Sequence, residues 1–293
     1  MDWNKKLPLT QALLWIVVSM FFSVAIFSFY RKVVTAKGRE ISYEPIVSSI
    51  IQTGSHREAL STEYLAEILA LSSDKPLRVK DLDCKKMEDR LLSSPLISQA
   101  NVKLMKPGTL YIDYAVRQPV AFLEDYENTA IDRQGFAFPF NPFFSPKKLP
   151  SFYLGMEESL DWRQNLSSEK LNLCFEILSC VSDFSVCDQF PVQRIDVSQA
   201  FSPSYGRREV VVTVEDVFMR HKEGRDVEYH QKRFLRLHPK QFAKELANYL
   251  TLRKQLLETE GKEERSPSLQ ESALYLKDKV IDLRLDQLAF IRE

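Results

Sequence analysis

Glycine and histidine are scarce in this 293-residue chain, which contains only eight glycines and four histidines. No Gly-rich loop that could cradle a phosphate group occurs among so few glycines. The histidines, His56, His221, His230 and His238, show neither metal-site spacing nor a His-Glu-x-x-His pattern. The sequence therefore gives no sign of a bound nucleotide or metal, and we expect no cofactor.

Cysteine is also scarce. The four cysteines, Cys84, Cys174, Cys180 and Cys187, fit no Cys-x-x-Cys or zinc-binding pattern. Cys174 and Cys180 fall on roughly opposite sides of an expected helix, so we do not expect them to bond to each other. Cys180 and Cys187 could pair across the end of that helix, or all four residues could be ordinary thiols.

A net charge and the motifs of covalent catalysis are missing as well. Forty basic residues balance forty acidic ones, so the basic patch or high pI of a nucleic-acid-binding protein is absent. Ser-x-x-Lys, the acyl-enzyme motif of penicillin-binding proteins, begins at Ser72, Ser145 and Ser167. That chemistry also needs a Ser-Asp-Asn motif and a Lys-Thr-Gly strand, and neither occurs. We therefore predict that the protein is not an enzyme.

One long uncharged segment near the N-terminus is present. Residues 7–30 carry no charge and are followed at once by Arg31 and Lys32. Because roughly 20 helical residues cross a hydrocarbon core, we predict a transmembrane helix over residues 9–30 after a short tail, residues 1–8. A cleaved secretory signal is the alternative, but its apolar stretch usually has only about 7 to 15 residues.

The charges beside this segment do not fix its orientation. Two lysines precede it and four basic residues follow within ten positions, which taken literally would leave the C-terminal bulk in the cytoplasm. Long domains, however, translocate largely regardless of flanking charge. The topology stays open at this point.

The first folded unit is expected over residues 41–117. An apolar run at 46–54 reads as a strand, and Ser61 and Asp83 read as caps of two helices, each flanked by a hydrophobic staple. Alternating apolar residues over 100–116, broken by a Lys-Pro-Gly-Thr turn, predict a β-hairpin. The order strand, helix, helix, strand, strand places both helices on one face of a small sheet.

Residues 118–293 predict a second α+β domain. Two apolar stripes at helical spacing are expected to face its core: Leu171, Cys174, Phe175, Leu178 and Val181, then Phe242, Leu246, Tyr249 and Leu250. Strands are expected at 120–124, 192–197, 209–214, 234–237, 280–283 and 288–291. The charged residues 221–226 read as an exposed hairpin tip, and 258–268 as a solvated connection.

A proline-rich segment at residues 139–150 carries Phe140, Phe143 and Phe144. It is expected to be a surface loop packed by its own aromatic rings. An exposed patch for a partner is the alternative.

The order of these elements resembles a bacterial family. An anchor followed by β-α-α-β-β resembles a POTRA domain, and Arg117-Gln118-Pro119-Val120-Ala121 resembles the join between the POTRA and β domains of the FtsQ/DivIB division proteins. Residues 131–138 resemble that family's Asp-x-x-Gly hairpin, and residues 280–284 its late Ile-Asp-Leu-Arg strand. From the residues alone, Pro119 suits a strand start between two sheets, because it has no N–H to donate.

The resemblance implies an α+β fold with a single N-terminal transmembrane helix, a POTRA domain and a β domain with a mixed or antiparallel sheet and two helices. It also implies a single-pass protein of the inner membrane at the division septum, with a cytoplasmic N-terminus and extracytoplasmic domains. The implied function is that of a non-catalytic divisome scaffold. Its implied partners are bitopic proteins like FtsB and FtsL, with other divisome membrane proteins as further candidates.

The expected partner-binding surface lies near the C-terminus. A final strand can leave an open sheet edge whose N–H and C=O groups accept a strand from a partner. The resemblance places this surface at Arg284, Leu285, Asp286, Gln287, Leu288, Ala289 and Phe290. The same side chains could instead merely complete the sheet.

Two other functions remain open from the sequence. A POTRA-containing protein of secretion or outer-membrane assembly would normally continue into many alternating segments of about ten residues, and these are absent. A membrane-anchored peptidoglycan enzyme would turn over peptidoglycan or its lipid-linked precursors, and replacing one polar residue would abolish that activity.

Overall fold

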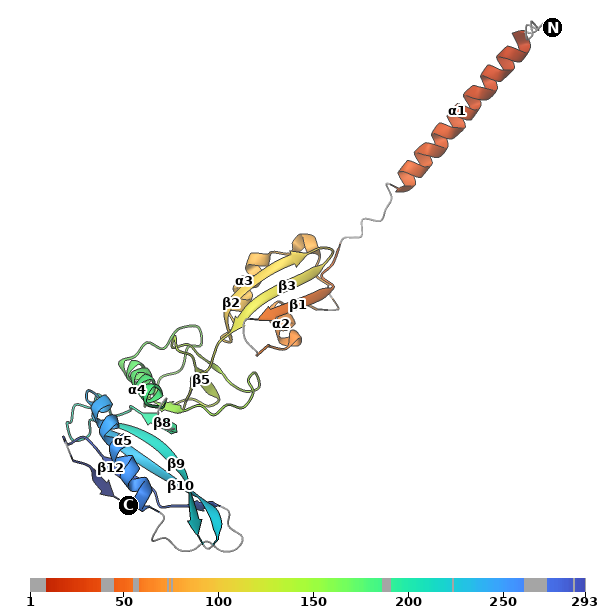
Figure 1. Cartoon of the computed structure of the whole chain (residues 1–293). Coiled ribbons are helices and arrows are strands. Elements are labelled where there is room, and N and C mark those ends of the chain that lie inside the picture. The colour runs from red at the N-terminus through yellow and green to blue at the C-terminus, as the bar shows by residue number, and fades with distance from the viewer. Residues whose placement is uncertain are drawn as a thin grey trace.

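The computed structural model describes residues 9–37, 45–54, 58–72, 74, 76–185, 191–222, 224–260, 273–286 and 288–292. It is a mixed α/β protein with an N-terminal apolar helix and a large mixed sheet (Figure 1). The expected tail at 1–8, the start of the first unit at 41–44, His56, Cys187 and Gln287 lie outside the described residues.

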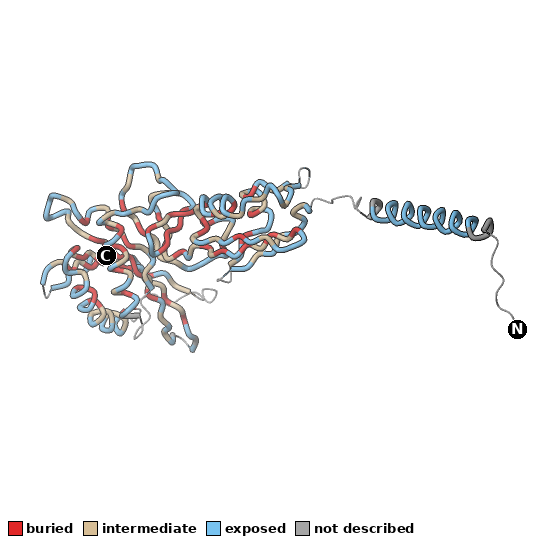
Figure 2. The backbone as a smooth tube through the Cα atoms, turned by 90° about the horizontal axis from the view of Figure 1, so that it is seen from above, coloured by how far each residue is buried: buried red, intermediate tan, exposed pale blue. Residues whose placement is uncertain are grey.

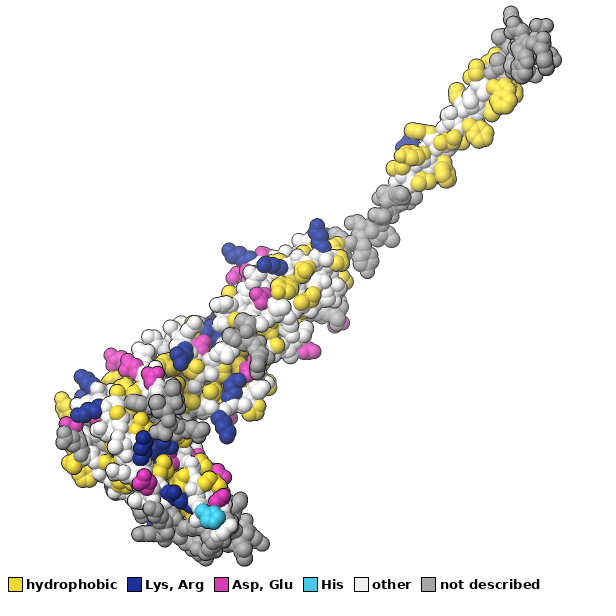
Figure 3. Space-filling view, viewed as in Figure 1, with side chains coloured by type: hydrophobic (Ala, Val, Ile, Leu, Met, Phe, Trp, Pro, Cys, Tyr) yellow, Lys and Arg dark blue, Asp and Glu magenta, His cyan; other side chains and the backbone are white. Residues whose placement is uncertain are grey.

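The N-terminal helix α1 (Leu9–Lys37) stands apart from the rest of the molecule (Figure 1). Its segment Leu13–Val34 is long and apolar enough to cross a membrane, with a mean hydropathy of 2.2. Every side chain in that segment is exposed, and apolar groups cover the helix in Figure 3. A helix that is apolar on all sides and is not covered by protein is suited to the hydrocarbon core of a lipid bilayer.

The next unit has the predicted order of elements around a three-stranded sheet. Its strands run in the order β1-β3-β2, with β1 parallel and β2 antiparallel to β3. The elements are β1 (Ser49–Gly54), α2 (Thr62–Ile68), the 3-10 turn η1 (Val79–Asp81), α3 (Cys84–Leu92), β2 (Ile97–Met105) and β3 (Thr109–Val116). The first strand is shorter than predicted, because residues 45–47 instead bond to the segment 77–79.

Both predicted helix caps are confirmed. The side chain of Ser61 accepts a hydrogen bond from the N–H of Tyr64, and that of Asp83 accepts one from Lys86. These bonds satisfy N–H groups that have no partner within the first helical turn. They explain why two short helices begin where they do.

The large sheet has ten described strands. Along its main path they run in the order β13-β12-β10-β9-β8-β7-β4-β5-β6, and β11 pairs with β10 beside β12. The strands are β4 (Ala121–Leu123), β5 (Thr129–Ile131), β6 (Ala137–Pro139), β7 (Ser151–Tyr153), β8 (Val192–Asp196), β9 (Val210–Lys222), β10 (Arg225–Leu237), β11 (Ala273–Tyr275), β12 (Lys279–Asp282) and β13 (Phe290–Arg292).

Two helices join parallel strands of this sheet and share its core. Helix α4 (Glu169–Ser185) links β7 to the parallel strand β8, and α5 (Phe242–Thr259) links β10 to β11 and β12. Leu171 and Ile177 of α4 and Leu246 and Tyr249 of α5 are buried in one cluster with the strands. Figure 2 shows the buried residues in the interior of the folded part, with exposed residues around them. Both predicted helical stripes are confirmed as core-facing.

The other end of the sheet packs on the three-stranded unit. Ala130, Phe138, Phe140 and Phe144 belong to the same buried cluster as residues of α2, α3 and β3. Phe140 stacks on Phe144, with ring centroids 5.4 Å apart. The proline-rich segment is therefore a loop packed by its aromatic rings, as predicted, and the alternative of an exposed aromatic patch is wrong.

The strands of the β9–β10 hairpin are two to three times as long as the sequence indicated. Strands were predicted at 209–214 and 234–237, but each strand has 13 residues and the pairing continues to the tip, Lys222 opposite Arg225. The tip at 221–226 lies where it was predicted. Cross-strand pairing holds the outer halves of both strands extended. Of the predicted solvated connection at 258–268, residues 261–268 lie outside the described residues.

Candidate functional site

The candidate site is the C-terminal edge of the large sheet. Strand β13 is antiparallel to β12, with Ile281 opposite Ile291 and Asp282 opposite Phe290. No described strand pairs with its outer side. The predicted edge strand is therefore present, although it begins later than expected, because the N–H of Leu288 bonds to the carbonyl of Leu285 in a turn.

Large apolar side chains are exposed along this edge. The exposed fraction is 55% for Leu285, 60% for Leu288, 57% for Phe290 and 42% for Ile291. Neighbouring residues of a strand point to opposite faces, so the exposure of every residue of β13 means that neither face is covered. An uncovered edge strand with two exposed apolar side chains of its own and two more just before it is a surface that a partner can bury.

The other predicted site residues surround this strand. Ala289 is exposed, and Asp286 forms an exposed ion pair with Lys244 of α5 at 2.6 Å. Arg284 is not a free cation, because both of its terminal groups are engaged. It binds both oxygens of Asp282, at 2.9 and 2.7 Å, and donates to the carbonyl of Gly206 at 3.3 Å.

These contacts hold the backbone next to β13 in place. Burial alone would raise the pKa of Asp282, but hydrogen bonds from Arg284 and the charge of Arg236 leave that pKa below its usual value. Glu209 accepts a hydrogen bond from Arg236 and lies 3.5 Å from Arg284. The turn that leads into β13 is thus held to β12, β10 and the start of β9.

A buried acid lies in α5 near this turn. Glu245 is 4% exposed, and its carboxylate accepts a hydrogen bond from the N–H of His238 at 2.7 Å. Burial raises its pKa to about 7, an effect that the nearby Asp282 increases and Arg284 reduces. The charge of this residue therefore changes near neutral pH.

A buried ionic cluster at the other end of β12 was missed from the sequence. Arg233 of β10 is fully buried and bonds to Asp216 of β9 and to Glu260, which follows α5. Arg253 pairs with Asp216 at 2.7 Å, and Lys279 of β12 with Glu260 at 3.0 Å. No local pattern could have revealed it, because the partners of Arg233 are 17 and 27 residues away.

The predicted junction residues lie between the two sheets. Arg117 pairs with Asp132 at 2.8 Å, and both side chains are about nine-tenths buried. Its guanidinium also donates to the carbonyl of Pro95 and lies 3.9 Å from the centre of the Phe136 ring. Pro119 is buried between β3 and β4, which belong to different sheets. Arg117 thus ties the three-stranded unit to the β5–β6 turn.

That turn has the predicted Asp-x-x-Gly chemistry. One oxygen of Asp132 accepts hydrogen bonds from the N–H groups of Gln134 and Phe136, both at 2.9 Å. Gly135 has a φ of +83°, and a Cβ there would lie 3.0 Å from the carbonyl oxygen of Leu166. Glycine is therefore required both by the backbone conformation and by the close approach of a neighbouring segment.

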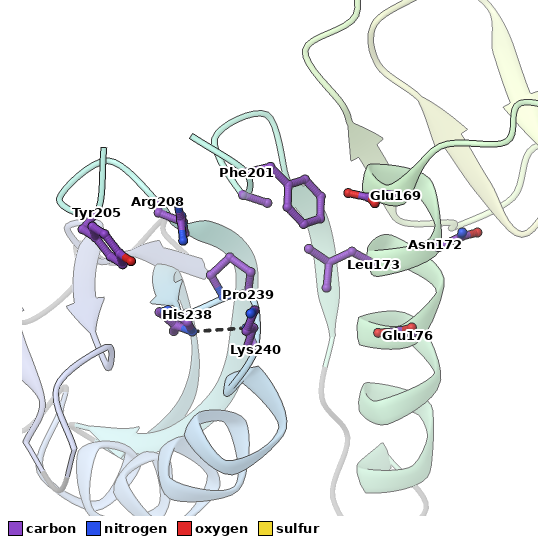
Figure 4. A pocket seen from close by; sticks show the side chains of 11 residues that line it. Glu169, Asn172, Leu173, Glu176, Phe201, Tyr205, Arg208, His238, Pro239 and Lys240 are labelled. Atoms are coloured by element: carbon purple, nitrogen blue, oxygen red, sulfur yellow. Dashed lines mark hydrogen bonds between the residues drawn. The ribbon is translucent and has the colours of Figure 1, made fainter. Parts of the chain in front are cut away.

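A cleft of about 710 Å³ lies between α4 and the loops that carry Arg208 and His238 (Figure 4). Glu169 and Glu176 on α4 form one wall, and Arg208, His238 and Lys240 come from loops opposite. The loop that carries Tyr205 and Arg208 is joined to the turn before β13, because Arg284 donates a hydrogen bond to the carbonyl of Gly206. The cleft is open and its lining charges are not gathered around one point.

The described residues show no arrangement for metal binding. They hold no cluster of three or more metal-ligating side chains. His221 faces Asp226 and His230 faces Glu215, so two histidines have carboxylate partners on the β9–β10 hairpin. Burial raises the pKa of the Cys174 thiol far above its usual value, which makes this residue an unreactive core group.

Comparison with known proteins found no family model and no curated protein that matches the chain.

Proposed function

We propose that the protein is a non-catalytic, membrane-anchored scaffold that captures an extended segment of a partner protein at the outer edge of β13. The observation that carries this proposal is an edge strand that is exposed on both faces and bears large apolar side chains. A partner strand would pair with the free N–H and C=O groups of this edge. Apolar side chains of that strand would then cover Leu288, Phe290 and Ile291.

The supports of the edge suit this role. Part of the cost of binding an extended segment is the ordering of side chains and loops at the interface. Here Arg284, Asp282 and Glu209 hold the turn that precedes β13, and Lys279 ties β12 to the buried ionic cluster. The protein's side of the interface is therefore already ordered before a partner arrives.

The anchor supports capture of another membrane protein. An apolar helix such as α1 would confine the protein to the membrane plane, which raises the effective concentration of any partner anchored in the same membrane. We propose a single span with a cytoplasmic N-terminus and with both folded units outside the inner membrane. Bitopic division proteins like FtsB and FtsL are the proposed partners, and the division septum is the proposed site of action.

The arrangement of the first unit supports this assignment. Its order of elements is β-α-α-β-β, which resembles that of a POTRA domain, and its first strand is parallel to its last. The join at Arg117 and Pro119 then leads into a sheet that ends in β13. We propose that this pair of units corresponds to the POTRA and β domains of the FtsQ/DivIB division proteins.

The test is a capture experiment with the full chain in detergent. The parent protein and a Leu288→Asp, Phe290→Asp variant would be used to recover partners from solubilised bacterial membranes. Replacing Met105 with Asp is the matched control, because Met105 is 50% exposed at the end of β2 in the other sheet. We expect small single-span division proteins with the parent and the control, and a loss of at least tenfold with the edge variant.

Two results would contradict the proposal. Equal recovery by the parent and the edge variant, at equal melting temperatures, would show that β13 does not bind the partner. Recovery of secretion or outer-membrane assembly components instead of division proteins would reject the divisome assignment while leaving strand capture in place.

A further inference from the structure

The first turn of α5 lies next to the segment that leads from β12 into β13. We call residues 283–286 of this segment the edge turn. Glu245 is almost completely buried in the first turn of the helix, and its carboxylate accepts a hydrogen bond from the N–H of His238, which follows β10. A buried acid therefore contacts the end of β10 close to the edge turn.

Two cations close to this carboxylate hold the edge turn. Lys244 of α5 pairs with Asp286 at 2.6 Å, and Arg284 binds both oxygens of Asp282 through Nε and one terminal nitrogen. The other terminal nitrogen of Arg284 donates to the carbonyl of Gly206. These two cations therefore tie the edge turn to α5, to β12 and to the loop before β9.

The charged side chains around the edge turn already balance one another. Three carboxylates pair with three cations: Asp282, Glu209 and Asp286 with Arg236, Arg284 and Lys244. The ring of His238, the other titratable group beside Glu245, accepts a hydrogen bond from the N–H of Lys240. An ionised Glu245 would thus be a fourth negative charge that shares the same three cations.

The charge of Glu245 acts directly on the contacts of the edge turn. Burial is the main reason that its pKa rises from 4.5 to about 7; Asp282 adds to this effect, and Arg284 and Lys244 oppose it. These interactions are mutual, so an ionised Glu245 attracts the two cations and repels Asp282. The three side-chain nitrogens of Arg284 are all engaged, and it can approach Glu245 only by giving up a bond that holds the edge turn.

We propose that ionisation of Glu245 releases the edge turn, so that β13 is firmly held below neutral pH and opens more often above it. This opening is a property of the chain alone. Its consequence for partner capture rests on the function proposed above. A partner segment should bind best while Glu245 is protonated, because the edge is then already ordered.

The direction and size of the effect follow from the release of a proton. A carboxyl group whose pKa is about 7 when the edge turn is closed returns toward 4.5 when opening exposes it to water. Opening then releases a proton and is favoured as pH rises. Between pH 6 and pH 8 the population of the open form should rise by about tenfold. Gln at this position has no proton to release, so it removes the effect.

The test is amide hydrogen exchange of the full chain in detergent at pH 6 and pH 8, followed by mass spectrometry and corrected for the intrinsic effect of pH on exchange. The peptide from residue 283 onward reports on β13 and on the bond between the N–H of Leu288 and the carbonyl of Leu285. A peptide from the β2–β3 hairpin reports on the rest of the fold. The variant is Glu245→Gln, and Glu258→Gln is the matched control, because Glu258 is exposed near the end of the same helix.

The expected difference is confined to one peptide and one variant. We expect the C-terminal peptide to exchange about tenfold faster at pH 8 than at pH 6 in the parent and in Glu258→Gln, but not in Glu245→Gln. The β2–β3 peptide should not change. An unchanged C-terminal peptide in the parent would overturn the proposal. Equal acceleration of both peptides, or the same acceleration in Glu245→Gln, would also overturn it, because global unfolding or another group such as His238 would then be the cause.

Partner capture at the same two pH values separates this proposal from the proposed function. Weaker recovery at pH 8 with the parent, and equal recovery at both pH values with Glu245→Gln, would extend the effect to binding. Equal recovery with the parent at both pH values would overturn the effect on capture. If no division protein is recovered at either pH while the difference in exchange persists, partner capture fails and the release of the edge turn stands.

Discussion

The two edges of the ten-stranded sheet differ in whether the rest of the protein covers them. At the β6 end, Ala130 and Phe138 are completely buried against the three-stranded unit, and Arg117 bonds across the join. At the β13 end, every described residue is exposed on a strand of three residues. A sheet edge left without cover attracts other chains, so one end is closed by the protein itself and the other is left open. At the open end we expect substitutions to affect partner binding more than the stability of the fold.

The largest effect is expected at the closed end. Replacing Phe138 with Ala removes a buried ring that belongs to the shared core, at a cost of about 3 to 5 kcal/mol in the free energy of unfolding. Replacing Phe290 with Ala, the matched change at the open end, should cost less than about 0.5 kcal/mol. Urea unfolding followed by circular dichroism measures both. Equal losses would remove the distinction between the two ends.

The next effect concerns the pair that fastens the closed end. Replacing Arg117 with Met leaves the carboxylate of Asp132 buried without its cation and should destabilise the protein by about 3 kcal/mol. We expect partial rescue when Asp132 is also replaced by Asn, which keeps an acceptor for the turn N–H groups. A double-mutant cycle from urea unfolding measures this coupling. If Arg117→Met were as stable as the parent, the ion pair would not stabilise the contact between the two units.

A pH-dependent effect is expected beneath the open end. The pKa of Glu245 is raised from 4.5 to about 7, so the folded protein holds a proton that the unfolded chain releases. Stability therefore falls as pH rises between these values, and a neutral Gln at this position escapes the loss. The stability advantage of Glu245→Gln should grow by about 2 kcal/mol from pH 5 to pH 7. Melting curves across this range test it, and a constant difference would show that Glu245 is ionised throughout.

The smallest effect is expected for the ion pair on the surface of the open end. Lys244 and Asp286 are each about 60% exposed, so water and salt screen their attraction. Replacing Asp286 with Asn should change the free energy of unfolding by less than about 0.5 kcal/mol. The same variant is informative for partner capture, since a change in recovery without a change in stability would assign this charge to the binding surface. A loss comparable to that of Arg117→Met would show that the turn before β13 supports the fold.

Local chemistry was readable from the sequence, and long-range chemistry was not. The caps at Ser61 and Asp83, the two helical stripes and the Asp132 turn depend on residues within one or two turns of each other. The short strands β5, β6, β7 and β11 were not among the predicted strands, although the turn between β5 and β6 was recognised, and their partners in the sheet are set by long-range pairing.

The candidate site divides in the same way. Its edge strand was predicted, since an apolar segment near the chain's end follows a turn. The contacts of Arg284 with Glu209 and Gly206 join residues more than 70 positions apart, so no spacing rule reveals them. The cluster around Arg233 escaped notice for the same reason, and a buried arginine looks like any surface arginine in a sequence.

The direction of the strands at the open end has a mechanical consequence. Strand β13 runs antiparallel to β12, which in turn runs parallel to β10. Tension applied along a captured segment would therefore act parallel to these strands and load their backbone bonds together, as in shear. Bonds loaded together resist more force than bonds opened one after another. If β13 captures a partner segment as proposed, the joint would therefore resist a pull along the strands better than a pull across them.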